Sequence, residues 1–202
     1  MVQSLHDQHY VHRDIKPENF MIHGDDPTVF LIDFGLARLY CNPTTFLHIP
    51  LTTNHTAIGT LPFASINSQR GDSQSRRDDL ESLAYTIIYS VLGKLPWTGN
   101  SVRINKKAVL EKKISIMAGE LCKGLPAPFC KFLTHVHSLG FKGKPDYQLL
   151  HSILSECSEA VTEQHSKAAP LYTFSDVSAE SLDHASIDAG SVGRESINTG
   201  RV

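Results

Sequence analysis

The sequence predicts a mainly α-helical chain with one small β-hairpin near its N-terminus. Three observations support this fold class. Apolar residues recur at three- and four-residue spacing over residues 80–92, which is the period of a helix. Two short apolar runs flank a turn sequence around residues 23–27, which is typical of a hairpin. From residue 158 to 202 the composition shifts to Ser, Ala, Asp, Glu and Gly without any period, and this predicts a disordered tail.

The hairpin is the first predicted element along the chain. Its strands are expected at residues 20–22 and 29–32, which hold strand-forming residues, and the segment between them contains Gly, Asp and Pro. Antiparallel pairing of these runs turns the chain back on itself. We therefore expect Asp33, which follows the second strand, to lie alongside Asn19, which precedes the first.

The second predicted element is a helix that is apolar on most sides, as expected for the middle of a domain. Gly93 and Pro96 are expected to end it. Asp79, near its start, is expected to cap the helix, to face the backbone around residue 14 from behind, or to do both. The apolar positions are Leu80, Leu83, Ala84, Tyr85, Ile87, Ile88, Tyr89, Val91 and Leu92.

Three further helices are predicted at residues 108–117, 128–139 and 147–157. A basic cluster at the start of this region is predicted to be a solvated helix face, with phosphate docking or nuclear targeting as alternatives. It consists of Arg103, Lys106, Lys107, Lys112 and Lys113.

Two motifs carry the chemistry. Residues 12–19 read His-Arg-Asp-Ile-Lys-Pro-Glu-Asn and residues 33–35 read Asp-Phe-Gly, and this pair resembles the catalytic motifs of protein kinases. Phosphoryl transfer depends on positioning and charge neutralisation. The resemblance implies four roles: a carboxylate that orients the substrate hydroxyl, a cation at the transferring phosphate, and two ligands for Mg²⁺. The candidates, in that order, are Asp14, Lys16, and the pair Asn19 and Asp33.

Neighbouring positions are expected to support these groups. His12 is interpreted as a packed, hydrogen-bonded histidine, Phe34 as a plug in the core, and Gly35 as a point of backbone freedom. Met21 is a candidate contact for ATP. Arg13 is expected to face residues 36–67, which contain no Asp or Glu.

Arg13 therefore has no carboxylate partner within that loop. We expect it to meet a phosphate, on a bound anion, on a primed substrate, or on one of the loop threonines. A solvated arginine without a partner is the alternative. The loop threonines are Thr44, Thr45, Thr52, Thr53 and Thr56.

Residues 4–157 resemble the casein kinase 1 family of serine/threonine protein kinases. The most specific segment is Ala-Ser-Ile-Asn at 64–67, which stands where most kinases have Ala-Pro-Glu. Further matching segments are residues 33–38, 48–50, 59–60, 75–83, 95–97, 121–124 and 144–147.

This resemblance implies an α+β family fold, of which residues 1–157 would supply the C-terminal lobe while the N-terminal lobe is absent. It implies ATP and Mg²⁺ as cofactors, and transfer of the γ-phosphate to Ser or Thr of acidic or phosphorylated protein substrates. It also implies that the hydroxyl of Thr60 bridges Asp14 and Lys16. Some pattern matches in the tail, such as Asp188 three residues before Ser191, resemble sites that the family phosphorylates.

Composition restricts the partners. With 202 residues, 41% apolar content and a net charge of −2, the chain can bury one core and has no electrostatic requirement for nucleic acid. No long apolar run or signal peptide is present, and the four cysteines show no Cys-x-x-Cys spacing. We expect no membrane partner and a cytoplasmic or nuclear location. An exposed upper face around Met21, Ile32 and Phe34 is expected to need a covering partner.

Three functions remain open. The chain is the C-terminal lobe of an active kinase, a catalytically inactive pseudokinase-like module that binds substrates or partners, or a truncated gene product. We expect the chain alone to be inactive, since the Gly-rich loop and the strand lysine that hold ATP would precede residue 1.

Overall fold

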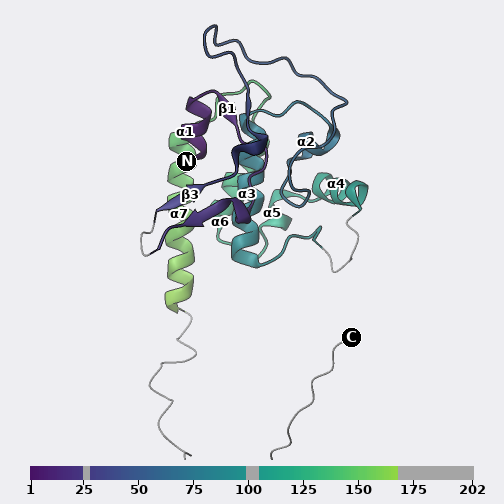
Figure 1. The fold of residues 1–202 in the computed structure, drawn as a ribbon. Helices are drawn as coiled ribbons and strands as arrows, with labels where there is room; N and C mark the ends of the chain where they lie inside the picture. The colour runs from purple at the N-terminus through teal and green to yellow at the C-terminus, as the bar shows by residue number, and fades with distance from the viewer. Residues whose placement is uncertain (25–27, 99–104, 168–202) are drawn as a thin grey trace, which may run out of the picture. The chain divides into compact units, whose positions relative to one another are not determined.

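The computed structural model describes residues 1–24, 28–98 and 105–167. This part of the chain is mainly helical, as predicted, with two small antiparallel sheets (Figure 1). The elements in chain order are α1 (Val2–Asp7), β1 (Tyr10–Val11), η1 (Pro17–Asn19), β2 (Phe20–Ile22), β3 (Val29–Leu31), η2 (Phe34–Leu36), β4 (Arg38–Leu39), α2 (Ile66–Arg70), α3 (Arg76–Leu92), α4 (Lys106–Ser115), α5 (Ala118–Leu121), α6 (Ala127–His137) and α7 (Tyr147–Lys167).

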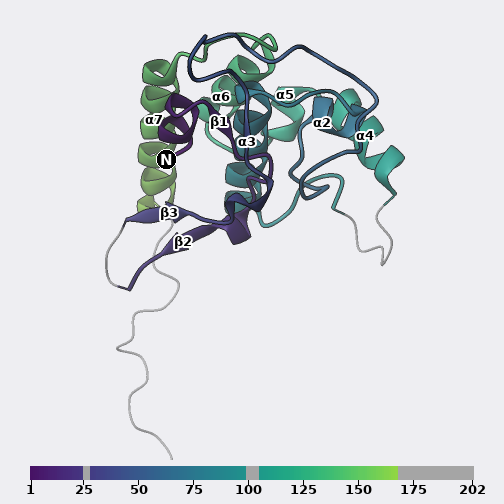
Figure 2. The ribbon, with the colours of Figure 1, turned by 45° about the horizontal axis from the view of Figure 1, so that its top comes forward.

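Helix α3 is the predicted central helix, and α6 and α7 pack around the same core (Figures 1 and 2). Four apolar side chains of α3 are buried, Leu80, Ala84, Tyr85 and Ile88, whereas Val91 near its C-terminal end is 42% exposed. Asp78 accepts a hydrogen bond from the Ser75 backbone N–H at 2.7 Å and so caps the N-terminus. The helix ends at Gly93, whose φ of 69° is a left-handed value that glycine adopts without strain.

The predicted hairpin is confirmed. Strands β2 and β3 pair antiparallel, with Phe20 opposite Leu31 and Ile22 opposite Val29, while residues 25–27 of the turn lie outside the described residues. A second pair, β1 with β4, was not predicted because each strand holds only two residues. This second pair joins the residues just before the first motif, residues 12–19, to the segment that follows Asp-Phe-Gly, and residues 12–19 are called the catalytic loop below.

The C-terminal helices differ from the predictions in three ways. The short helix α5 is separate from α4. Helix α7 does not end near Cys157 but continues to Lys167, and only residues 168–202 of the predicted tail lie outside the described residues. Lys113 is not on the solvated basic face, because only 2% of it is exposed, and Arg103 lies outside the described residues.

Apolar side chains are exposed on the β2–β3 hairpin and the adjacent η2 turn. The predicted exposure of Met21 and Phe34 is observed, at 53% and 51%, whereas Ile32 is half-buried. The expectation that Phe34 plugs the core is therefore wrong in this structure. The other exposed apolar residues here are Ile22, Val29, Phe30 and Leu36. None of the described helices is long and apolar enough to span a bilayer.

Candidate active site

The carboxylate of Asp14 lies at the centre of a hydrogen-bonded group. Its Oδ1 accepts from the backbone N–H and from the hydroxyl of Thr60, both at 2.7 Å. Its Oδ2 lies 2.8 Å from the ammonium of Lys16, which also donates to the Thr60 hydroxyl at 3.0 Å. The threonine hydroxyl thus bridges the aspartate and the lysine, in the arrangement that the family resemblance implies.

These contacts favour the ionised forms of Asp14 and Lys16. Burial by itself would raise the pKa of Asp14, but hydrogen bonds from Lys16 and Thr60 outweigh it and lower that pKa. The hydrogen bond to Asp14 raises the pKa of Lys16, with smaller contributions from Glu18 and Asp33. Both groups are therefore charged at neutral pH, and the 9% exposure of Asp14 leaves part of it accessible.

The absence of a side chain at Gly59 explains how the neighbouring Thr60 can lie so close to Asp14. It has a φ of 98°, and a Cβ at this position would lie 2.7 Å from the backbone oxygen of Arg13. A side chain here would collide with the catalytic loop backbone, which cannot move without displacing Asp14. Only glycine permits this approach.

The two candidate metal ligands come from adjacent segments. Asn19 is buried at the end of η1, and its Nδ2 donates to the Asp14 backbone oxygen at 2.8 Å, which leaves Oδ1 as its acceptor atom. The Ile32 backbone N–H donates to the Asn19 backbone oxygen at 2.9 Å, so Asp33 follows directly from a residue bonded to Asn19. Asp33 has a left-handed φ of 64° and is exposed.

A buried carboxylate holds the catalytic loop from behind. Asp79 of α3, which is 1% exposed, accepts hydrogen bonds from the backbone N–H groups of His12 and Arg13 at 2.6 and 2.8 Å. His6 Nε2 lies 3.0 Å from the same carboxylate, and its Nδ1 lies 2.6 Å from the Tyr147 hydroxyl. Helix α3 thereby fixes the loop, while Asp78 performs the capping role that was the alternative for Asp79.

His12 joins the catalytic loop to the strand that precedes Asp33. Its Nε2 donates to the Ile32 carbonyl at 3.0 Å and its Nδ1 accepts from the Asp14 backbone N–H at 3.3 Å. Both ring nitrogens are thus used in structural bonds. The Phe34 ring contacts the His12 ring edge-on at 5.2 Å, and the Gly35 N–H donates to Asp33 Oδ1 at 3.3 Å.

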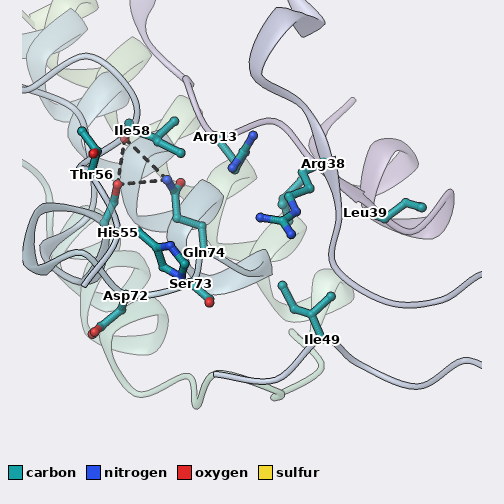
Figure 3. A pocket seen from close by; sticks show the side chains of 12 residues that line it. Arg13, Arg38, Leu39, Ile49, His55, Thr56, Ile58, Asp72, Ser73 and Gln74 are labelled. Carbon is teal, nitrogen blue, oxygen red and sulfur yellow. Dashed lines mark hydrogen bonds between the residues drawn. The ribbon is translucent and has the colours of Figure 1, made fainter. Parts of the chain in front are cut away.

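Arg13 lines a cavity of about 170 Å³ together with Arg38, His55 and Gln74 (Figure 3). Its Nε donates to the Leu36 carbonyl at 2.6 Å. Burial and the neighbouring Arg38 lower the pKa of Arg13, although Asp79 acts in the opposite direction. Two guanidinium groups facing one cavity favour an anion there.

Sequence analysis did not identify several members of these groups. His6 precedes the motif and has no distinguishing pattern. Arg38 follows Asp-Phe-Gly closely, so a basic residue at that spacing was an available signal that we did not interpret as functional. His55 and Gln74 reach the cavity from separate loops, and only the tertiary structure brings them together.

The oxygen-rich pair of Asn19 and Asp33 suits Mg²⁺, which prefers carboxylate and carbonyl ligands and usually keeps waters and substrate phosphates as the others. Within the described residues there is no cluster of three or more His, Cys, Asp or Glu side chains that could hold a metal ion. A site built on these two side chains would take its other ligands from water and phosphate oxygens.

Comparison with known proteins agrees with this geometry. Residues 1–160 match the protein kinase domain family model. The chain is 40% identical over 158 residues, 77% of its length, to a probable casein kinase I homolog of Encephalitozoon cuniculi, and 41% identical over 166 residues, 79% of its length, to casein kinase I homolog 2 of Schizosaccharomyces pombe. These alignments span 52% and 38% of the two relatives.

Proposed function

Since this chain belongs to the protein kinase domain family and is of the casein kinase 1 type, we propose that residues 1–160 act as the C-terminal lobe of an enzyme that phosphorylates Ser or Thr of acidic or phosphorylated proteins. The single observation that carries this proposal is the bonded group of Asp14, Lys16 and Thr60. It combines a carboxylate that is 9% exposed with a fixed cation, which are the groups that phosphoryl transfer requires.

In the proposed reaction the hydroxyl oxygen of the substrate bonds to the γ-phosphorus of ATP, and the bond to the β-phosphate oxygen breaks. Asp14 accepts a hydrogen bond from that hydroxyl and takes its proton as the new bond forms. Its lowered pKa makes it a weak base, so its main contribution is orientation. Lys16 supplies positive charge beside the transferring phosphate.

Asp33 and Asn19 are the residues that would hold Mg²⁺. When bound, the ion neutralises phosphate charge that these side chains alone cannot offset. Asp33 contributes the negative charge, while Asn19 ties the site to the catalytic loop through its bond to the Asp14 backbone oxygen.

Activity requires that the exposed apolar face of the hairpin and η2 be covered. This face holds Met21 and Phe34, next to Asp33, and a nucleotide resting there would have no cover from the described residues. The covering element is an N-terminal kinase lobe, on the same polypeptide or on a partner. Without it, reacting groups would not be held in line and water would not be excluded.

The cavity with Arg13 and Arg38 supports the preference for acidic or phosphorylated partners. An anion there would offset the positive charge of both guanidinium groups, and burial and the neighbouring Arg38 lower the pKa of Arg13. The second candidate function, a binding module without catalysis, is favoured by the exposed apolar face alone.

A transfer assay separates these functions. The full chain and a fusion of this chain to the N-terminal part of the Schizosaccharomyces pombe homolog would be tested with γ-labelled ATP and casein. We expect transfer by the fusion only, loss of it in Asp14→Asn and Asp33→Asn, and no loss in Asp7→Asn, which changes an exposed carboxylate outside the site.

Two results would contradict the proposal. A folded fusion that transfers no phosphate would reject catalysis and favour the binding module. Strong, Asp14-dependent transfer by the chain alone would reject the requirement for a covering lobe.

A further inference from the structure

Lys113 is a buried cation that no step above uses. It lies on α4 with 2% exposure, and its ammonium donates to the backbone oxygens of Leu61 and Ala64 at 3.0 and 2.6 Å. The same ammonium lies 4.9 and 5.1 Å from the ring centres of Tyr85 and Trp97. It is therefore surrounded by carbonyls and aromatic faces.

No salt bridge is found for Lys113 within the described part of the chain. Glu81 affects the pKa of Lys113 electrostatically but forms no salt bridge with it; its Oε1 accepts from the Ile66 N–H at 2.9 Å and from the Tyr85 hydroxyl at 2.7 Å. A buried charge without a directly bonded counter-ion is costly. In return, this ammonium donates two hydrogen bonds that an apolar side chain of similar size could not make.

The carbonyls that Lys113 binds belong to one tight turn, residues 60–64. Inside the turn, the N–H groups of Phe63 and Ala64 donate to the Thr60 oxygen at 2.9 Å. From outside, Gln69 Nε2 donates to the same two carbonyls as Lys113, at 3.3 and 3.0 Å. The outward carbonyls of the turn are thus gathered by donors from α2 and α4.

The Pro62 carbonyl of this turn accepts from Trp97 Nε1 at 2.8 Å. The first residue of the turn, Thr60, is the one that bonds Asp14 through both its N–H and its hydroxyl. We propose that Lys113 is a positioning residue: its ammonium holds the turn 60–64 in the conformation that presents Thr60 to Asp14. The link to catalysis rests on the proposed function, but the link to the turn does not.

Gain or loss of the Lys113 proton would then change the conformation of turn 60–64 within the physiological pH range. Burial lowers its pKa to about 7, with Glu81 opposing the change. Loss of the proton removes the cation–π attraction and weakens both bonds to the carbonyls. Tyr85, which contacts the ammonium, has a pKa raised well above its usual value, and beyond Glu81 the charged or titratable groups are His137, Arg70 and Arg77, which line a cavity with Glu81.

The chain contains a single tryptophan, Trp97, and this makes the charge of Lys113 measurable without a variant. Trp97 emission of the full chain would be recorded from pH 5.5 to 9. We expect a transition with a midpoint of about 7 that is absent in Lys113→Met. It should persist in Lys112→Met, an exposed neighbour on the same helix, and in His137→Gln, because burial lowers the pKa of His137 below its usual range.

The second measurement is amide hydrogen exchange of Thr60, Phe63 and Ala64, whose N–H groups are all bonded. In Lys113→Met we expect exchange about tenfold faster or more at these amides, the factor for losing a charge-assisted hydrogen bond. The amide exchange rate in α3 and α6 should be equal to or lower than in the wild type, since removing a buried charge often stabilises a fold. Lys113→Arg, which keeps the charge, should recover part of the protection.

Each other outcome counts against the inference. A wild-type emission curve that is flat between pH 6 and 8.5 overturns the titration, and protection of the turn equal to wild type in Lys113→Met overturns the positioning role. Uniform loss of protection across α3 and α6 would show a general structural role instead. Neither the emission nor the exchange measurement needs ATP. A failed transfer assay would therefore not affect the test of Lys113, and a failed test of Lys113 would not affect the proposed function.

Discussion

Replacing Asp79 by Asn should destabilise the domain by an amount that the contacts of this carboxylate predict. Asp79 accepts from the His12 and Arg13 backbone N–H groups and from His6 Nε2, at 2.6, 2.8 and 3.0 Å. Asparagine keeps the shape, but it has one accepting oxygen and turns an amide NH₂ toward the remaining donors. One or two charge-assisted bonds are lost, each contributing about 1.5–3 kcal/mol.

The expected loss in free energy of unfolding is about 2–4 kcal/mol, a large part of the roughly 5–15 kcal/mol that stabilises a domain. Urea unfolding followed by circular dichroism would measure it on the full chain, with Asp7→Asn as a control that removes an exposed carboxylate. Because Asp79 is 1% exposed, salt should not screen the effect. A loss within about 0.5 kcal/mol of the control would refute the reasoning.

Three further predictions follow from the same structure. Gly59→Ala should cost about 1–3 kcal/mol in unfolding free energy, because the new Cβ meets the Arg13 oxygen and φ is left-handed; a neutral result in urea would contradict this. The lowered pKa of Asp14 means that its stabilising contribution is present above its unfolded pKa of about 3.9 and is lost as pH falls through the folded value, so Asp14→Asn should flatten the acid limb of stability against pH. Truncation after Cys157 should lower the melting temperature more than truncation after Lys167, where α7 ends, and equal melting temperatures would show that the last part of α7 adds nothing.

Local chemistry explains what the sequence could predict. Strand-forming runs around a Gly-Asp-Asp-Pro segment predict the hairpin, and dense apolar positions ended by Gly93 predict α3. The first kinase motif could be interpreted for the same reason: Asp14 and Asn19 are only five residues apart, and one short 3₁₀ turn, η1, lies between Lys16 and Phe20. Hairpin pairing then brings Asp33 to the strand that follows Asn19. These groups are close in sequence or joined by one hairpin, so the sequence could predict that they lie together.

Other features depend on contacts between segments far apart in sequence. Periodicity placed the end of the last helix at Cys157, yet α7 continues to Lys167. Composition assigned Lys113 to a solvated basic face, although only 2% of it is exposed and its ammonium lies against the rings of Tyr85 and Trp97. Helix propensity and charge do not predict which face of a helix packs against another element.

The amino-acid sequence by itself indicated the kinase family and the mainly helical fold, and it predicted Asp14, Lys16 and Asp33 as candidate catalytic groups, because each lies in a short segment with a fixed period or spacing. Only the tertiary structure shows which residues hold these groups in place. Asp79 binds the catalytic loop from α3, and Lys113 binds the turn that carries Thr60 from α4. Burial and directional hydrogen bonds between distant elements make these choices, and they exist only once the chain has folded.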